Sequence, residues 1–262
     1  MTNTNDTTPR IATTAAQGMD RRSAMRLGTL GAAAVAATAM GRGSAANAQT
    51  ESGANLELSG KTAFITGGAR GIGLATAEEL ARAGADIVLF DVASGSLPHV
   101  SYPISTRADL DAAQARVEAL GVRCLAVQGD VRDLEAQRAA MAQGAATLGG
   151  IDIVVANAGV SHVGPIEEVE SGEITTQFEV NVGGVIKTTQ AAVPFLRERG
   201  GGRIIYISSG LGRVGNELFP IYTTTKWAVI GFGKSAALSY GRDNIMCNIV
   251  APGLVSDPAC RQ

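Results

Sequence analysis

Two side chains in the last quarter of the sequence have the types and spacing needed to move a proton. Tyr222 and Lys226 are four positions apart in a helix-like segment over 221–240. Residues at i and i+4 share one face of a helix, so the spacing brings a phenol and an ammonium together. A free phenol titrates near pH 10, and a neighbouring positive charge lowers its pKa. The pair could act in acid–base catalysis, whereas the chance alternative is a core tyrosine beside a surface lysine.

A glycine-rich turn earlier in the chain is typical of a phosphate-binding site. The turn reads Thr66-Gly67-Gly68-Ala69-Arg70-Gly71-Ile72-Gly73, between an apolar run over 62–66 and a helical pattern over 72–83. Glycines let the backbone approach a pyrophosphate closely, and a helix N-terminus offers free N–H groups and a partial positive charge. The strand–turn–helix context is what makes this pattern specific for a dinucleotide.

An acidic residue about 18 positions after the turn indicates which dinucleotide is bound. Asp91 ends a second apolar run, over 86–90. Its carboxylate can accept hydrogen bonds from the adenosine ribose hydroxyls and would repel a 2′-phosphate, so the sequence predicts NAD rather than NADP. Arg70 is the counterargument, because a basic side chain in the turn could compensate for a phosphate.

Strand-like runs alternate with helical patterns from about residue 58 onward. The runs cover 62–66, 86–90, 123–127, 151–156, 203–207 and 245–250. This alternation predicts an α/β fold with a doubly wound parallel sheet, a Rossmann fold, in a single domain. The connection over 92–107 is longer than a crossover requires. Its pattern favours a surface loop, with a segment lining the adenosine end of the site as the alternative.

These motifs, taken together and in order, resemble the classical short-chain dehydrogenase/reductase family. The likeness covers about 58–257 and includes Thr66-Gly-x-x-x-Gly71-x-Gly73 and Tyr222-x-x-x-Lys226. It implies that a dinucleotide contacts the turn and the carboxyl ends of the strands. The residues implied are Gly67, Arg70, Gly71, Ile72, Gly73, Asp91, Asp130, Val131, Asn157, Ala158, Gly159, Tyr222, Lys226, Pro252 and Gly253.

The resemblance also implies a catalytic set of Asn181, Ser209, Tyr222 and Lys226. Ser209 stands 13 positions before Tyr222, the family's separation, and would hydrogen-bond the substrate oxygen; Ser208 is the alternative. Asn181 matches a helix-kinking asparagine whose carbonyl holds a water joining Lys226 to solvent; the alternative is a locally bonded amide. The expected reaction is hydride transfer between NAD(H) and a secondary alcohol or ketone, with Tyr222 exchanging the hydroxyl proton.

The C-terminal end departs from the family pattern. Relatives continue after Pro-Gly with a substrate lid and a seventh strand, whereas this chain stops at Gln262, nine residues beyond Gly253. Asp257 also stands where a threonine usually contacts the nicotinamide carboxamide. We therefore expect the usual seventh strand to be lacking. The alternative functions are a dinucleotide-binding protein with little or no turnover, and a structural or assembly role.

Residues 1–48 resemble a twin-arginine signal peptide. Arg21-Arg22 precedes an apolar run over 27–40 and the cleavage-like Ala46-Asn47-Ala48, although Ala24 stands where a phenylalanine is usual. The run is too short to span a bilayer, which needs about 20 residues. We expect a linker over 49–57, the Rossmann domain over 58–262, and export to the periplasm. If the segment is only an N-terminal extension, the protein is cytoplasmic.

Composition and charge narrow the choice of partners. The chain is 45% hydrophobic and 18% charged with net charge −2, which is ordinary for a globular protein and gives no basic surface for nucleic acid. No cysteine or histidine spacing suits a metal. His162 is expected in a solvent-exposed loop, the alternative being the edge of the substrate pocket. Relatives usually associate through the helices that begin near Glu173 and Ile221, so a homodimer or homotetramer is expected.

Overall fold

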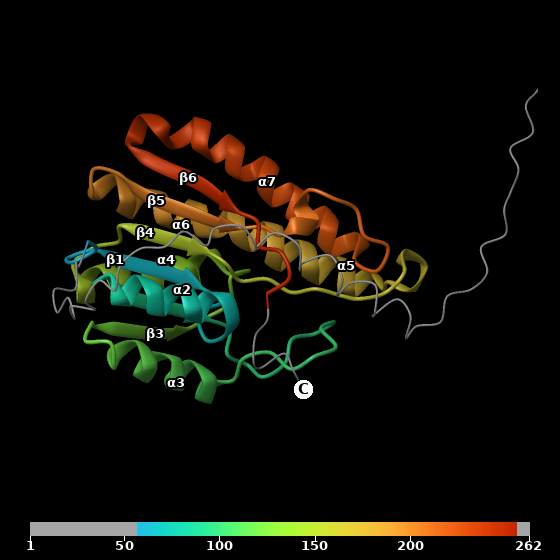
Figure 1. Cartoon of the computed structure of the whole chain (residues 1–262), viewed down its shortest axis with the longest axis horizontal. Coiled ribbons are helices and arrows are strands. Elements are labelled where there is room, and N and C mark those ends of the chain that lie inside the picture. Colours follow the sequence, from blue (N-terminus) through green and yellow to red (C-terminus); the bar gives the residue numbers. More distant parts are fainter. Residues whose placement is uncertain (1–56, 256–262) are drawn as a thin grey trace, which may run out of the picture. The chain divides into compact units, whose positions relative to one another are not determined.

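A computed structural model describes residues 57–255 as one parallel sheet with helices on both faces (Figure 1). The predicted signal peptide, almost all of the predicted linker and Asp257 lie outside the described residues. The strand order is β3-β2-β1-β4-β5-β6. The strands are β1(Thr62–Thr66), β2(Asp86–Asp91), β3(Cys124–Gln128), β4(Ile153–Ala156), β5(Gly202–Ile207) and β6(Ile245–Val250). The predicted doubly wound Rossmann sheet is confirmed.

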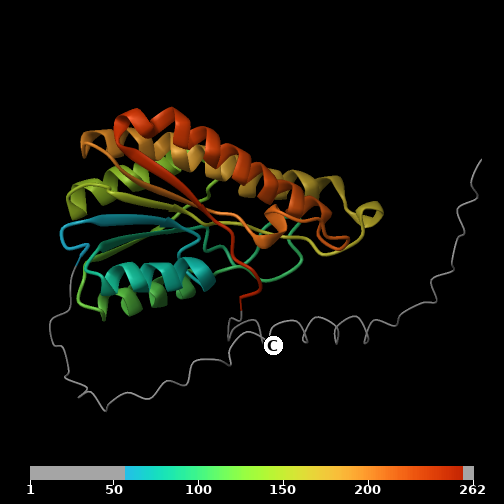
Figure 2. The same ribbon diagram turned by 45° about the horizontal axis from the view of Figure 1, so that its top comes forward.

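Two layers of helices cover the sheet (Figure 2). The helices α2(Gly71–Arg82) and α3(Arg107–Glu118) pack on one face, where Ile65, Leu89 and Leu110 are fully buried. The other face is covered by α4(Leu134–Leu148), α6(Val185–Glu198) and α7(Pro220–Tyr240). Burial on both faces explains why the strands read as continuous apolar runs rather than alternating ones.

The strand register brings the carboxyl ends of the strands to one edge of the sheet. Thr66 of β1 pairs with Phe90 of β2, and Asp91 pairs with Gln128 of β3. The strand order reverses between β1 and β4, which is the switch point where open α/β sheets bind ligands. The residues that follow each strand therefore converge on one groove. Among the described residues, β6 forms one edge of the sheet.

A long helical segment is interrupted where the sequence predicted a kink. The helix α5(Ser171–Phe178) passes through the π-helical η2(Glu179–Gly184) into α6. A π-helical turn breaks the regular hydrogen bonding of an α-helix and often marks a functional site. Asn181 lies inside η2 and is fully buried. Three short 3₁₀ turns complete the described elements: η1(Ile166–Glu168), η3(Gly210–Gly212) and η4(Gly241–Asp243).

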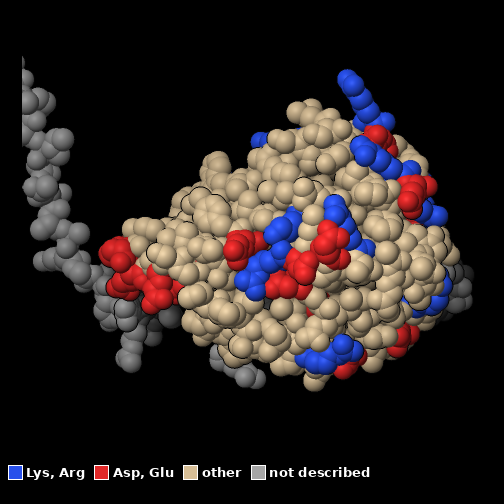
Figure 3. Space-filling model, turned by 180° about the vertical axis from the view of Figure 1, so that it is seen from behind, with Lys and Arg blue, Asp and Glu red and all other residues tan. Residues whose placement is uncertain are grey.

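Charged side chains of both signs are interspersed on the face shown in Figure 3. Ion pairs of neighbouring basic and acidic side chains are common in the described residues, as in Arg82–Glu79 and Arg116–Glu78. That face therefore carries no broad surface of a single sign. Within residues 57–255, no helix combines the length and apolar character needed to span a membrane.

Candidate active site

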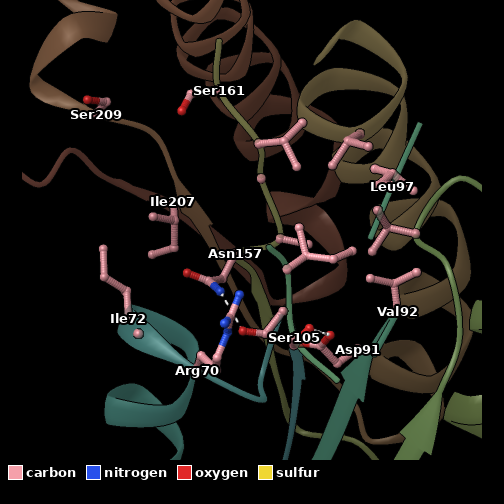
Figure 4. Close-up of a pocket in the computed structure, with 18 of the residues that line it drawn as sticks. Arg70, Ile72, Asp91, Val92, Leu97, Ser105, Asn157, Ser161, Ile207 and Ser209 are labelled. Atoms are coloured by element: carbon pink, nitrogen blue, oxygen red, sulfur yellow. Dashed lines mark hydrogen bonds between the residues drawn. The ribbon is translucent and has the colours of Figure 1, made fainter. Parts of the chain in front are cut away.

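A cavity of about 780 Å³ runs along the carboxyl ends of the strands (Figure 4). Its volume lies within the range of ligand pockets, about 300–1,000 Å³. The cavity is lined by every residue expected to contact a dinucleotide except Gly73. The lining includes Gly67, Arg70, Gly71, Ile72, Asp91, Asp130, Val131, Asn157, Ala158, Gly159, Tyr222, Lys226, Pro252 and Gly253. Arg70 and Asp91 lie toward one end of the cavity, and Ser161 and Ser209 toward the other.

The glycine turn has the backbone conformation that a phosphate-binding loop needs. Gly67 and Gly71 have φ values of +65° and +55°, in the left-handed region that disfavours residues with a Cβ. Arg70 precedes α2 and makes no side-chain cap. The N–H groups of the first turn of α2 are thus not capped by this side chain, and Gly71 and Ile72 of that turn line the cavity. The turn and the helix N-terminus fit an anionic pyrophosphate.

Gly73 has a packing role in this structure. A Cβ on Gly73 would lie 2.0 Å from the carbonyl oxygen of Gly67 and 2.6 Å from Nδ2 of Asn157. Gly73 therefore lets α2 start close behind the turn, and it does not line the cavity. Its place in the glycine pattern is explained by close packing of helix and turn rather than by contact with a ligand.

Asn157 and Thr66 join the glycine turn to the neighbouring strand β4. Asn157 Nδ2 donates to the carbonyls of Thr66 at 2.9 Å and Gly67 at 3.1 Å. In return, Oγ1 of Thr66 accepts from the N–H groups of Asn157 at 3.0 Å and Ala158 at 3.1 Å. The two segments hold each other in place, which fixes the floor of the cavity where β1 and β4 meet.

Asp91 is held in the cavity wall by three donors. Its oxygens accept from the N–H groups of Ala69 and Ala93, both at 3.0 Å, and from the hydroxyl of Ser105 (Figure 4). The side chain is only 6% exposed. A carboxylate offers about four lone-pair directions, so three donors leave room for one ligand hydroxyl. This acidic residue fits the ribose of an unphosphorylated dinucleotide.

The segment over 92–106 lines the cavity, so the surface-loop interpretation was wrong. Leu97 and Ile104 are buried and anchor the segment in the core beside β2. Arg70 Nη2 donates to the carbonyl of Pro103 at 3.1 Å. Because the Arg70 guanidinium is hydrogen-bonded to this main chain, it is less available to bind a 2′-phosphate, which weakens the argument for NADP. The residues of the segment that line the cavity are Val92, Leu97, Tyr102, Pro103, Ile104 and Ser105.

Asp130 and Val131 close the cavity beyond β3. Asp130 accepts from Nε of Arg132 at 2.9 Å and from Nη2 at 2.7 Å. Burial opposes ionisation of Asp130, but the hydrogen bonds and charge of Arg132, with the charge of Lys187, outweigh it and lower its pKa. Asp130 is therefore a carboxylate fixed by its neighbour, available as an acceptor at the cavity wall.

Tyr222 and Ser209 meet at the opposite end of the cavity. The Ser209 side chain is close enough to the phenol of Tyr222 to influence its pKa, and both residues line the cavity. Burial raises the pKa of Tyr222, and the Ser209 hydrogen bond opposes this shift. The charge that Tyr102 would carry raises the Tyr222 pKa further. The direction is opposite to the one expected from Lys226 alone.

Lys226 is buried beneath Tyr222, one helical turn further along α7. Its Nζ lies 5.4 Å from the centroid of the Tyr222 ring and donates to the carbonyl of Ile207 at 2.9 Å. The residue is 4% exposed, and burial lowers its pKa to about 8. A Cβ on Gly159 would lie 3.5 Å from Nζ, so the glycine after Asn157-Ala158 leaves space beside the ammonium.

Ser208 and Ser209 have different partners. Ser208 Oγ donates to the main-chain carbonyl of Lys226 at 2.8 Å and so ties β5 to α7. Ser209 Oγ accepts from the N–H of Leu211 at 3.2 Å and also reaches Tyr222. The geometry therefore places Ser209 beside the phenol and gives Ser208 a structural bond.

Asn181 lies behind the cavity and does not line it. Its Oδ1 accepts from the N–H of Val160, and its Nδ2 donates to the carbonyl of the same residue, both at 2.8 Å. Nδ2 also donates to Oγ1 of Thr225 at 3.0 Å. The side chain thus joins the loop after β4 to α7, which carries Tyr222 and Lys226. Asn181 positions these residues rather than touching a ligand.

His162 is not the solvent-exposed histidine that was expected. Its Nδ1 lies 2.7 Å from a carboxylate oxygen of Glu173, and both side chains are largely buried. The pair fastens the loop after β4 to α5 and does not line the cavity. In the part of the chain that the structure describes, no group of three His, Cys, Asp or Glu side chains could hold a metal ion.

Comparison with known proteins agrees with the arrangement of this site. A family model described as short chain dehydrogenase matches residues 61–262. The chain belongs to the short-chain dehydrogenase family. It is therefore an oxidoreductase of that family, and the predicted membership is confirmed.

Individual relatives cover most of the domain. The (-)-trans-carveol dehydrogenase of Rhodococcus erythropolis is 35% identical over 77% of this chain and 73% of its own. The crystal structure of carveol dehydrogenase from Mycobacterium avium in complex with NAD has a TM-score of 0.74 and 37% identity, and it covers 76% of this chain and 73% of its own. A short-chain dehydrogenase from Mycobacterium paratuberculosis bound to NAD has a TM-score of 0.72 and 38% identity, over 74% and 72%.

Proposed function

We propose that the protein is an NAD-dependent dehydrogenase that interconverts a secondary alcohol and its ketone. The observation that carries the proposal is the phenol of Tyr222, which meets the Ser209 hydroxyl at one end of a cavity whose other end is an anion-binding turn with Asp91. The carveol dehydrogenases among the relatives support an alcohol as the substrate.

The cavity favours NAD over NADP. The uncapped start of α2 would hold the pyrophosphate, Asp91 would accept from the adenosine ribose, and Lys226 would donate to the nicotinamide ribose. The structures of two relatives contain NAD, which supports the same choice. When bound, the nicotinamide would take a hydride from the alcohol or return it to the ketone.

The protein's own residues would manage the proton. Tyr222 takes the hydroxyl proton at its phenolic oxygen during oxidation and returns it during reduction. Ser209 donates a hydrogen bond to the substrate oxygen and stabilises negative charge that develops there. Burial raises the pKa of Tyr222, so the phenol carries the proton that reduction of a ketone needs, and oxidation needs that proton removed first.

Lys226 and Asn181 would connect the phenol to solvent. Lys226, with a pKa of about 8, can give up and regain a proton close to neutral pH. The π-helical turn at Asn181 interrupts regular main-chain bonding, so a carbonyl there can bond to a water. We propose that such a water completes the relay, while the Asn181 side chain fixes the loop after β4.

The proposal is tested by assaying the full chain with a panel of secondary alcohols and ketones. NAD⁺ and NADP⁺ are compared, beside the variants Tyr222→Phe and, as a matched control, Tyr240→Phe on the same helix. We expect NAD-dependent turnover that Tyr222→Phe abolishes and Tyr240→Phe retains. NADH binding without any Tyr222-dependent rate would instead favour the dinucleotide-binding alternative, and no binding at all would favour a structural role.

The exposed apolar side chains of α7 support self-association. Trp227 is 52% exposed and Leu238 is 86% exposed, both on the helix through which relatives were expected to pair. Large apolar side chains of this kind are enriched in interfaces. We propose a homodimer or homotetramer through α5 and α7. Light scattering of the wild type and of Trp227→Glu tests it, and a monomeric wild type contradicts it.

Export is proposed from residues 1–48 alone. We propose that the twin-arginine segment carries the folded domain across the cytoplasmic membrane. Fractionation of cells that express the full chain, beside Arg21→Lys and Arg22→Lys together, tests this. Periplasmic protein that is lost in the double variant is expected, whereas cytoplasmic protein in both cases contradicts it.

A further inference from the structure

The segment over 92–106 brings an aromatic side chain to the end of the cavity where Tyr222 lies. The Tyr102 hydroxyl accepts a hydrogen bond from the N–H of Ser161 at 3.0 Å, although the two residues are 59 positions apart. Ser161 lies with Ser209 at the end of the cavity away from Arg70 and Asp91 (Figure 4). Tyr102 and Tyr222 both line the cavity, and a charge on Tyr102 would raise the pKa of Tyr222.

Tyr102 projects from a firmly anchored base. Within the segment, Gly95 N–H donates to the carbonyl of Ser105 at 2.8 Å, and Ile104 N–H donates to the carbonyl of Gly95 at 3.2 Å. Ser105 is bonded to Asp91, and the carbonyl of Pro103 is bonded to Arg70. The residues on the C-terminal side of Tyr102 are therefore tied to both the glycine turn and β2, which defines where the ring can lie.

The Tyr102 side chain is only partly covered by the protein. Tyr102 is 40% exposed and lines the cavity, so a large apolar face is available there to a bound molecule. An aromatic side chain whose polar tip is bonded and whose ring is free is typical of a binding surface. Through its bond to Ser161, Tyr102 lies at the cavity end that holds Ser161, Ser209 and Tyr222.

Apart from Lys226, the residues placed at this end of the cavity, Tyr102, Ser161, Ser209 and Tyr222, carry neutral side chains. The charged lining residues Arg70 and Asp91 lie at the other end of the cavity. Asp130 follows β3, which is separated from β4 and β5 by β1 and β2 in the sheet. Lys226 is buried beneath the phenol and bonded to Ile207. A charged substituent beside the reacting carbon would lose its hydration here, and Lys226 is already bonded to the carbonyl of Ile207, so burying such a substituent is costly.

We propose that Tyr102 is a specificity-determining residue, whose ring packs against the substituent beside the reacting carbon and selects neutral substrates with a bulky apolar group. The inference rests on the proposed function, because it concerns the substrate of the same site. A substrate ring or branched alkyl group would stack on Tyr102, while the oxygen it carries bonds to Ser209 and Tyr222. The segment that contacts the adenosine side of the cavity thereby also shapes the substrate side.

The test compares the full-length wild type with Tyr102→Ala, Tyr102→Phe and the matched control Ser101→Ala, which alters an exposed neighbour. Kinetics are measured for cyclohexanol, 2-propanol and lactate, and NADH affinity is measured by fluorescence. We expect Tyr102→Ala to raise the KM for cyclohexanol by about tenfold or more, the scale of apolar pocket contacts. The kcat, the KM for 2-propanol and NADH affinity should change little, and lactate should not react.

The remaining variants separate the ring from its hydroxyl. Tyr102→Phe keeps the ring and should retain the preference for cyclohexanol over 2-propanol, as should Ser101→Ala. An equal loss for cyclohexanol and 2-propanol in Tyr102→Ala would overturn the proposal, as would a loss of NADH affinity of the same size. The first would indicate a general structural defect, and the second a contact with the cofactor.

A binding measurement keeps this inference separate from the proposed function. Cyclohexanone binding to the NADH-loaded protein is measured by saturation-transfer NMR in a Tyr222→Phe background, where turnover plays no part. Binding that Tyr102→Ala weakens by about tenfold supports the inference even if no alcohol is turned over by the wild type. Equal binding with and without the Tyr102 ring, or no binding with it, overturns the inference whatever the enzyme's activity.

Discussion

The hydroxyl of Ser209 lies close enough to the phenol of Tyr222 to influence its pKa, whereas that of the adjacent Ser208 donates to the main-chain carbonyl of Lys226 at 2.8 Å. Both serines line the cavity, but the Ser208 hydroxyl is already engaged by the carbonyl of Lys226, whereas the Ser209 hydroxyl acts on the phenol. We therefore assign Ser209 to catalysis and Ser208 to joining β5 to α7.

Removing the Ser209 hydroxyl should impair catalysis more than stability. In Ser209→Ala we expect kcat to fall by about 10²–10³, the usual effect of losing one donor to a developing oxyanion. Ser208→Ala is the matched comparison, and it should lower the melting temperature through loss of the buried bond to Lys226 while retaining most of kcat. The reverse pattern would make Ser208 the catalytic serine.

The direction of the Tyr222 shift predicts the pH dependence of the reaction. Oxidation requires the phenolate, and burial raises the pKa of Tyr222, so kcat/KM for oxidation should still be rising at about pH 10, where a free phenol is half ionised. The Ser209 hydrogen bond opposes the shift, so Ser209→Ala should move the rising limb to higher pH. A limb centred near pH 7, or a downward move in the variant, would contradict the assignment.

Replacing Lys226 should abolish activity without lowering the stability of the fold. The pKa of Lys226 is lowered to about 8 by burial, so below pH 8 the native state carries a buried charge that the unfolded chain solvates freely. A shift of this size corresponds to about 3 kcal/mol, offset in part by the bond to Ile207. We expect Lys226→Met to lose activity without a lower melting temperature at pH 7.

The pH dependence of stability tests whether the pKa of Lys226 is lowered in the folded protein. A group whose folded pKa is lowered from 10.5 to about 8 adds stability as the pH rises between those values. Any stability advantage of Lys226→Met should therefore be largest below pH 8 and shrink toward pH 10. Other groups titrate equally in both proteins, so the difference between their melting curves isolates Lys226. An advantage that grows with pH would refute the buried ammonium.

Asp91 should control the choice between the two dinucleotides. Replacing its charge in Asp91→Asn removes the repulsion of a 2′-phosphate, and we expect the NAD⁺/NADP⁺ ratio of kcat/KM to fall at least about tenfold, or about 1.4 kcal/mol. Asp86→Asn is the control on the same strand, because Asp86 pairs with Arg123 at the opposite end of β2. An unchanged ratio in Asp91→Asn would remove its assigned role.

The strands and the glycine turn could be predicted because their signals are local. Each buried strand is a short apolar run, and the positive φ values of Gly67 and Gly71 follow from the glycine pattern itself. The contribution of the 92–106 segment could not be predicted in the same way. Its place depends on Leu97 and Ile104 reaching the core and on Ser105 reaching Asp91, which are contacts between separate elements.

The site residues show the same limit. The Tyr222–Lys226 spacing predicts proximity, yet the direction of the Tyr222 pKa shift depends on burial by segments distant in the sequence, Tyr102 among them. Gly73 fits the motif, but its neighbours Gly67 and Asn157 explain it by packing. His162 is held by Glu173 from another element, and nothing adjacent to it in the sequence points to that partner.

The bond network between Thr66 and Asn157 has a consequence for how the polypeptide matures. The donors that steady the glycine turn arrive 91 positions later than the threonine they reach. When only β1, α2 and β2 have been synthesised, the glycine turn still lacks its hydrogen bonds to Asn157 and Ala158. Contacts between residues so far apart in the sequence also form slowly. Dinucleotide capture should begin only once β4 has docked, so the first appearance of NADH affinity during synthesis would mark the assembly of the central strands.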